Sequence, residues 1–259
     1  MQSIDRKYAT ILNIRLSSTT IQGVLRFVQD AITRGHKFSI VTPNPEIVLE
    51  AQSDPRLASA LTSADISLPD GVGLIFAAKF LGQQPLNLLK GREIFLELIS
   101  LANKKGWRVF LLGGEKGVSE KAAEKLKLNY KKIQVMTEAG PVLDKNGEAV
   151  SSSDQICQVG LIRQINAFSP QILFVGFGCP KQEKWVTKWL SKLEIGGAMV
   201  VGGTFDFIAG RTQLPPKWME KLGLEWLWRV FTKPGHVRRV LEAVFLFPLK
   251  VFLYRVRNC

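Results

Sequence analysis

The strongest constraint on the fold is a repeated pattern in which a short apolar run ends at glycine and a helical pattern follows. The second half of the chain contains three such runs, at residues 107–112, 171–175 and 197–201. Runs this apolar are typical of strands buried on both faces, which occur in parallel sheets covered by helices. We therefore predict an α/β fold in which a Rossmann-like parallel sheet is flanked by helices.

The first half of the chain has the same rhythm with weaker signals. Thr20 is a good N-cap for an amphipathic helix, and two strands are expected to end at the turns Pro43-Asn44-Pro45 and Leu68-Pro69-Asp70-Gly71. The expected strands of this half are 10–16, 37–42 and 65–68. The further expected helices of the chain lie near 46–52, 55–63, 117–127 and 181–192, and residues 140–154 are expected to form a loop.

Charge indicates an anionic partner. Lys and Arg number 35 against 22 acids, which gives a formal net charge of +13 on 259 residues. Nucleic acid, a membrane surface or a phosphate-bearing substrate would each suit this excess. The cysteines, Cys157, Cys179 and Cys259, are odd in number and widely spaced, so they suggest neither a disulfide framework nor a zinc motif and fit a reducing cytoplasm.

Two kinds of targeting segment are not expected from the sequence. Residues 1–20 hold no long apolar run, so we expect no signal peptide. The sequence has no stretch of 18 uninterrupted apolar residues, so we expect no ordinary membrane-spanning helix.

The C-terminal segment differs from the rest of the chain. Residues 226–259 hold seven Lys or Arg against the single acid Glu242, and aromatic residues lie between the charges. We therefore divide the chain into an α/β domain, 1–225, and a basic amphipathic C-terminal helical appendage, 226–259. Residues 240–254 are mostly apolar but too few for a span, which favours a helix lying in a membrane interface. A core helix packed on the same domain or on a sister subunit is the alternative.

Glycines after the predicted strands are candidates for phosphate binding. Gly113-Gly114 and Gly202-Gly203-Thr204 follow apolar strands, where backbone N–H groups and the next helix can approach a diphosphate. A tight turn is the simpler explanation of such glycines. The third turn, Gly176-Phe177-Gly178, lacks the third glycine of a dinucleotide fingerprint, which argues against an NAD-dependent oxidoreductase.

Three polar residues follow strand ends in the first half. Asp70 is positioned either to cap the helix after it or to serve as a general base in a cleft. Thr42 and Asn44 are positioned either to contact a sugar or to shape the turn at Pro43 and Pro45.

The scarcity of metal-binding residue types bears on the chemistry. Only two histidines occur, His36 and His236, and the sequence has no Asp-x-Asp triplet. A Ser-His-Asp triad is hard to build from this set. We therefore expect no metal ion and no cofactor, so that protein cations and N–H groups must neutralise a departing diphosphate.

Several separate stretches resemble the WecG/TagA/CpsF family of bacterial glycosyltransferases. They are TPNPEIVLEAQSDPRLASALTSADISLPDGVGL, VGFGCPKQEKW, GGTFDFIAG and LPPKWMEKLGLEWLWRVFTKP, and they occur in the family's order between about residues 10 and 240. That family includes N-acetylmannosaminyltransferases of wall teichoic acid and enterobacterial common antigen synthesis. The resemblance implies an inverting, metal-independent transfer of a sugar to a lipid-diphosphate-linked acceptor.

The resemblance also implies roles for individual residues. It makes Asp70 the catalytic base, Thr42 and Asn44 sugar or acceptor contacts, and Gln182 an active-site residue. Arg229 and Arg239 match arginines that are thought to reach the active site and the membrane. Asp206, within the GGTFDFIAG stretch, joins Gly113, Gly114, Gly202, Gly203 and Thr204 as an expected substrate contact. The chain departs from the family's usual residues at Leu88, Glu93 and His236.

These observations support one leading hypothesis for function. An enzyme would move N-acetylmannosamine, or a related hexose, from a UDP-sugar to a lipid-linked sugar in cell-surface polysaccharide synthesis. Its partners would be the donor, the acceptor and an anionic membrane surface on the inner face of the cytoplasmic membrane, without nucleic acid, and a homo-oligomer stays open. The alternative is a non-catalytic basic module that binds nucleic acid or membrane.

Overall fold

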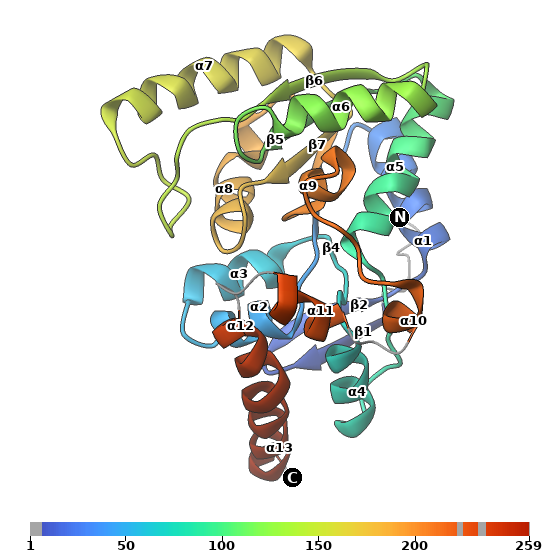
Figure 1. Cartoon of the computed structure of the whole chain (residues 1–259), viewed down its shortest axis with the longest axis vertical. Helices are drawn as coiled ribbons and strands as arrows, with labels where there is room; N and C mark the ends of the chain where they lie inside the picture. The colour runs from blue at the N-terminus through green and yellow to red at the C-terminus, as the bar shows by residue number, and fades with distance from the viewer. Residues whose placement is uncertain (1–6, 222–224, 233–236, 259) are drawn as a thin grey trace.

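The computed structural model describes residues 7–221, 225–232 and 237–258, and its centre is a six-stranded sheet in the order β4-β3-β8-β7-β5-β6 (Figure 1). Each neighbouring pair of strands in this sheet is parallel, which confirms the predicted Rossmann-like sheet. The strands are β3 (Phe38–Val41), β4 (Ile66–Ser67), β5 (Arg108–Gly113), β6 (Gln134–Glu138), β7 (Ile172–Gly176) and β8 (Gly197–Val200).

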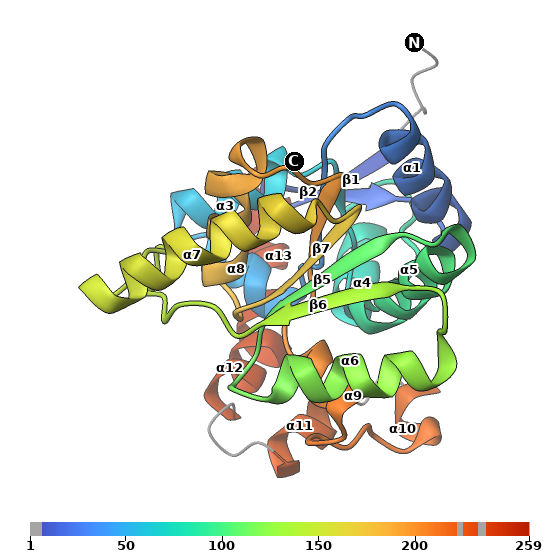
Figure 2. The same ribbon diagram turned by 90° about the horizontal axis from the view of Figure 1, so that it is seen from above.

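Helices cover both faces of the sheet because alternate strand residues point to opposite sides. In β5, Val109 and Leu111 join one buried cluster, whereas Phe110 and Leu112 join the other. Figure 2 shows α7 and α8 on one side of strands β5 to β7 and α5 and α6 on the other. The first cluster includes α1 (Ile21–Thr33), α5 (Gly91–Lys105), α6 (Val118–Asn129) and α9 (Thr204–Ala209); the second includes α2 (Pro45–Ala51), α3 (Pro55–Ser63), α7 (Ser152–Phe168) and α8 (Lys181–Trp189).

Side-chain caps fix where three helices of the first half begin. The side chains of Thr20, Asn44 and Asp54 accept hydrogen bonds from the backbone amides of Gly23, Ile47 and Leu57. Proline follows the cap in α2 and α3, where its missing N–H group costs nothing. The expected helices at 46–52 and 55–63 are confirmed, and these caps are the local signals that made them predictable.

Residues 10–16 do not form the single strand that the sequence predicted. They belong to an antiparallel hairpin of β1 (Lys7–Ile11) and β2 (Ile14–Ser18), against which α4 (Val72–Phe80) packs. Leu12 and Asn13 make the turn with φ angles of 48° and 64°. This turn contains neither glycine nor proline, so the usual sequence signals did not reveal it.

The C-terminal segment packs partly onto the α/β domain. It contains α11 (Glu225–Thr232), α12 (Val237–Leu241), a π-helical turn η3 (Glu242–Leu246) and α13 (Phe247–Asn258), and it follows the short helix α10 (Lys217–Lys221). Proline at position 248 cannot donate a backbone hydrogen bond and crowds the preceding turn, which explains the π-helical turn there. Phe247 and Val251 are buried in the cluster of α2 and α8.

The opposite side of α13 is apolar and exposed. Leu249, Leu253 and Val256 are 53%, 44% and 61% exposed, and their spacing places them on one stripe of the helix. In Figure 1 this helix projects from the end of the molecule opposite α7. Among the residues that the structure describes, no helix is long and apolar enough to cross a membrane.

Gly113 allows the ends of β5 and β7 to approach each other closely. It lies opposite Gly176, and a Cβ atom at position 113 would be 2.7 Å from the carbonyl carbon of Gly176. Its φ of +104° is also unfavourable for any other residue. Packing therefore explains this glycine without a bound phosphate.

We expect Gly113→Ala to lower the free energy of unfolding by about 2 kcal/mol or more, because the backbone strain alone costs on the order of 1–3 kcal/mol. Urea unfolding would measure the change. Gly160→Ala is the matched control: Gly160 lies inside α7 with no atom within 4 Å of the added Cβ, so a small gain in stability is expected. Unchanged stability with weakened binding of a UDP-sugar would instead assign Gly113 to the phosphate site.

Candidate active site

A polar cleft opens where the carboxyl ends of β3, β4, β7 and β8 meet, with a volume of about 290 Å³. Parallel strands bring these ends to one edge, which is where ligands bind in open α/β sheets. Seven of the predicted site residues line the polar cleft: Thr42, Asn44, Asp70, Gln182, Gly202, Gly203 and Thr204. Other lining residues include Glu46, Lys90, Gly91, Arg92, Gly178, Cys179, Gln213, Glu225, Trp228 and Thr232.

Asp70 does not occupy the capping position of the helix that follows it. Helix α4 has Gly71 at its N-cap, and the Asp70 carboxylate accepts a hydrogen bond of 3.0 Å from the amide of Gly91. Gly91 is the first residue of α5, so Asp70 interacts with the positive end of a different helix, 21 residues further along the chain. This contact holds the carboxylate at the edge of the polar cleft.

Thr42 and Asn44 reach the cleft from the end of β3. The side-chain oxygen of Asn44 accepts a hydrogen bond of 2.9 Å from Ile47, so this residue caps α2 as well as lining the cleft. Thr42 lies beside Gly91, where an added Cβ would be 3.1 Å from the threonine methyl group and 3.3 Å from the Asp70 carboxylate. Glycine at position 91 thus lets Thr42, Asp70 and the start of α5 come together.

Gln182 connects two glycine turns of the cleft. Its side-chain oxygen accepts hydrogen bonds from the amides of Gly178, at 3.3 Å, and Gly202, at 3.1 Å. Its side-chain nitrogen donates to a carboxylate oxygen of Glu183 at 2.9 Å. The side chain is only 2% exposed, so Gln182 holds the turns after β7 and β8 in fixed positions.

Glu183 is a buried acid directly behind this contact. It is 1% exposed, and its carboxylate interacts with the side chains of Gln182 and Cys179. Burial raises the pKa of Glu183, although the hydrogen bond from Gln182 acts in the opposite direction. This carboxyl group therefore loses its proton less readily than a carboxyl group in water.

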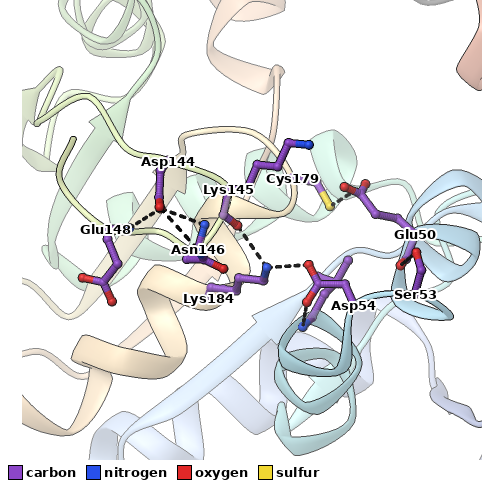
Figure 3. A network of polar contacts seen from close by, with 10 residues as sticks. Glu50, Ser53, Asp54, Asp144, Lys145, Asn146, Glu148, Cys179 and Lys184 are labelled. Carbon is purple, nitrogen blue, oxygen red and sulfur yellow. Dashed lines mark hydrogen bonds and ion pairs between the residues drawn. The ribbon is translucent and has the colours of Figure 1, made fainter.

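A partly buried ion pair anchors α8 (Figure 3). The ammonium group of Lys184 contacts the carboxylate of Asp54 at the start of α3 and donates to the carbonyl oxygen of Lys145 at 3.0 Å. Partial burial acts to raise the pKa of Asp54, but hydrogen bonds from Lys184 and the Leu57 amide outweigh it and hold that pKa below its usual value. The ion pair therefore ties the helix of Gln182 to two neighbouring segments.

Three predicted substrate contacts are not among the residues that line the polar cleft. Gly113 and Gly114 are not among its lining residues, and the Gly114 amide donates to the carbonyl of Gly176 at 3.1 Å. Asp206, in α9, does not line the cleft either, and its main-chain carbonyl accepts hydrogen bonds from Arg211 and Thr212. The side chains of Arg229 and Arg239 lie outside the described part of the chain.

Sequence reasoning missed two basic residues of the cleft. Lys90 and Arg92 flank Gly91 at the start of α5, and the Lys90 ammonium group forms an ion pair with Glu225 at the start of α11. This ion pair links the start of α11 to the cleft. The signal in the sequence is a Lys-Gly-Arg triplet at a helix start, but only the packing of α5 shows that it faces Asp70.

An apolar groove of about 480 Å³ adjoins the polar cleft. Five residues line both cavities: Asn44, Glu46, Asp70, Lys90 and Glu225. The rest of the apolar groove is formed by α4, Leu88 and the C-terminal helices, with Phe76, Phe80, Val244, Phe247, Val251 and Phe252 among its lining residues. Within the described residues, no group of three or more His, Cys, Asp or Glu is placed to hold a metal ion.

A carboxylate beside backbone amides and basic residues, at the carboxyl edge of a Rossmann-like sheet, is the arrangement expected of a transferase that acts on phosphorylated substrates. The chain belongs to the WecG/TagA/CpsF glycosyl transferase family, whose sequence profile matches residues 9–258. It is therefore a glycosyltransferase with a hexosyltransferase activity, and a non-catalytic nucleic-acid-binding module is not favoured.

Similar proteins carry a specific name. A relative from Bacillus spizizenii is 31% identical over 203 residues, which cover 78% of this chain and 74% of the relative. A relative from Staphylococcus aureus is 29% identical over 245 residues, 93% of this chain and 91% of the relative. Both are named N-acetylglucosaminyldiphosphoundecaprenol N-acetyl-beta-D-mannosaminyltransferase.

The raised pKa of Glu183 predicts a pH dependence of stability. A proton held more tightly by the folded state stabilises it below the ordinary pKa of about 4.5, and this contribution is lost as the pH rises through the higher folded-state pKa. We expect Glu183→Gln to lose less stability than the wild type between pH 5 and pH 8 in urea unfolding. Glu194→Gln, at an exposed position, is the control and should follow the wild type. Equal losses in wild type and Glu183→Gln would contradict a raised pKa of Glu183.

Proposed function

We propose that this glycosyltransferase moves N-acetylmannosamine, or a related hexose, from a UDP-sugar to the N-acetylglucosamine of a lipid-diphosphate acceptor. The names of the relatives support the acceptor and the transferred sugar. The observation that carries the proposal is the position of Asp70, whose carboxylate lies where the polar cleft meets the apolar groove. An acceptor with a polar sugar and an apolar lipid has one suitable environment on each side of this carboxylate.

Asp70 would act as the general base. Its carboxylate removes the proton from the acceptor hydroxyl as the hydroxyl oxygen attacks the anomeric carbon of the donor. The bond from that carbon to the diphosphate breaks on the opposite side, so the configuration at the anomeric carbon is inverted. The Gly91 amide orients the Asp70 carboxylate, and a well-placed base of this kind contributes about 10²–10⁴-fold to the rate.

The negative charge that develops on UDP requires positive partners. Arg92 lines the polar cleft at the start of the 15-residue helix α5, whose N-terminal end also carries partial positive charge. The backbone turn at Gly202 and Gly203 lies in the same cleft. We assign the diphosphate to this region, with Arg229 and Arg239 as further predicted contacts.

Asp70→Asn tests the catalytic assignment. Asparagine keeps the shape and an oxygen for the Gly91 amide but does not accept a proton at neutral pH, so kcat should fall by about 10²–10⁴-fold. A radiolabelled transfer assay would measure kcat, while thermal shift with UDP would show that folding and donor binding persist. The control is Asp65→Asn, because the Asp65 carboxylate also accepts a backbone amide, from Ser39, but does not line the cleft. Turnover by Asp70→Asn within about threefold of wild type would contradict the mechanism.

We further propose that the protein works as a peripheral protein at the inner face of the cytoplasmic membrane. The exposed stripe of Leu249, Leu253 and Val256 would enter the interface between headgroups and acyl chains. Lys250 and Arg257, on the same helix, would add attraction to anionic lipids, at about 1 kcal/mol for each basic residue near the surface.

A triple replacement with serine at Leu249, Leu253 and Val256 should weaken binding to phosphatidylglycerol vesicles by at least about tenfold, because three apolar side chains lose their burial. Co-sedimentation would measure the bound fraction. The matched control replaces Leu128, Ile156 and Val159, three exposed apolar side chains of α6 and α7, with serine. Equal effects of the two triple variants would argue against the α13 stripe as the membrane contact.

A further inference from the structure

We propose that the apolar groove binds the first isoprene units of the acceptor's lipid chain, so that the protein itself recognises the lipid. This inference rests on the proposed function, because it concerns the same acceptor. The inference goes beyond the proposed function because the part of the lipid's hydrocarbon chain next to the diphosphate would leave the bilayer. It would lie between α4 and the C-terminal helices. The groove volume of about 480 Å³ falls in the range of roughly 300–1,000 Å³ found for small-molecule sites.

The two long walls of the apolar groove are aromatic and aliphatic. Phe76 and Phe80 of α4 line one side, and Phe247, Val251 and Phe252 of α13 line the other. Phe76 and Phe252 are 70% and 52% exposed and line the same groove, so they belong to a contiguous apolar surface of the kind that marks a binding site. Covering them with a hydrocarbon chain would remove this apolar area from water.

Contacts between α13 and the domain hold these walls in place. The guanidinium group of Arg255 donates to the carbonyl oxygen of Phe80 at 2.7 Å and lies 4.6 Å from the centre of the Phe80 ring. The rings of Phe80 and Phe252 are 6.4 Å apart, and the Tyr254 hydroxyl contacts Asn13 at 3.2 Å. These contacts within the chain fix the two walls relative to each other, and a fixed site lowers the entropic cost of binding.

The order of environments matches the order of groups in the acceptor. Asp70 and Lys90 line both the polar cleft and the apolar groove, so they mark the junction between them. A sugar placed at Asp70 has its diphosphate next, within reach of the basic Lys90, and its hydrocarbon chain last, in the groove. The reverse orientation would bury the diphosphate among phenylalanines, which is strongly unfavourable.

The chemistry of the lining favours a hydrocarbon chain over a peptide. The polar side chains of the groove, Asn44, Glu46, Asp70, Lys90 and Glu225, are the residues that it shares with the polar cleft. A peptide backbone laid along the remaining apolar walls would find few side-chain hydrogen-bond partners, which is costly. A polyisoprene chain has no hydrogen-bonding groups, so it gives up no hydrogen bonds to water when it lies there.

The experiment compares two acceptors that differ only in chain length. Both carry N-acetylglucosamine diphosphate, one on an undecaprenyl chain and the other on a methyl group that has no isoprene unit, and both are assayed in nonionic detergent micelles without vesicles. The readout is the ratio of kcat/KM for the long acceptor to that for the short one. For Phe76→Gln and Phe252→Gln we expect this ratio to fall about tenfold, the effect of losing part of one aromatic contact.

Two further variants make the result specific. Ala243→Trp fills the groove from its C-terminal wall and should also lower the long-to-short ratio. Phe245→Gln is the matched control, because Phe245 is 70% exposed on the neighbouring helical turn but does not line the groove, so its ratio should stay at the wild-type value. Lowered ratios for Phe76→Gln, Phe252→Gln and Ala243→Trp, with an unchanged ratio for Phe245→Gln, would support the proposal.

Photocrosslinking gives a readout that does not depend on turnover. A geranyl diphosphate that carries a benzophenone should label peptides of α4 and α13, and the undecaprenyl acceptor should compete. Labelling confined to other segments, an unchanged ratio in both phenylalanine variants, or labelling by a diazirine phospholipid that the acceptor does not displace would overturn the proposal. If neither acceptor receives a sugar from the wild type, the proposed function fails, while the competition experiment still decides whether the groove binds prenyl chains.

Discussion

The common direction of the six sheet strands is the constraint on which the site depends. Because β3, β4, β7 and β8 are neighbours and run parallel, Thr42, Asp70, Gly178 and Gly202 follow strand ends that meet at one edge. These residues come from parts of the chain that are far apart, so no local interaction could assemble them. The hydrogen bond from Gly91 to Asp70 adds the start of a fifth segment, the helix α5, to the same point.

Around this edge, buried polar and charged side chains hold the loops in position. The side-chain oxygen of Gln182 accepts hydrogen bonds from two backbone amides, so this residue connects two turns of the cleft. Glu183 and Lys184, the next two residues, are both buried. Burial raises the pKa of Glu183, whereas the ammonium group of Lys184 pairs with the carboxylate of Asp54. Breaking that pair would leave a buried charge without a partner, which is costly, so the ion pair holds the start of α8 in place.

The sequence predicted the parts of this fold that have local signals. The strands near Phe110, Phe174 and Met199 were recognisable because each is apolar and ends at glycine. The edge strand β6 was not expected, because its Gln134–Glu138 segment is largely polar and has only one strand neighbour. Seven candidate site residues line the polar cleft, but Lys90 and Arg92 were missed since their position depends on how α5 packs. Gly113 and Gly114 suggested a phosphate site, whereas the close approach of β5 to β7 explains the first of them sterically.

The C-terminal helix α13 is where binding of the membrane and binding of the acceptor would meet. Its inner side, with Phe247 and Val251, packs on the domain and lines the apolar groove, while its outer side carries the stripe of Leu249, Leu253 and Val256. Helix α13 therefore faces the apolar groove on one side and the exterior of the protein on the other. A hydrocarbon chain leaving the groove past α13 would have only the width of a helix to cross before it reached the bilayer. The packing of α13 on α2 and α4 would thus fix the distance between the membrane-held lipid and Asp70.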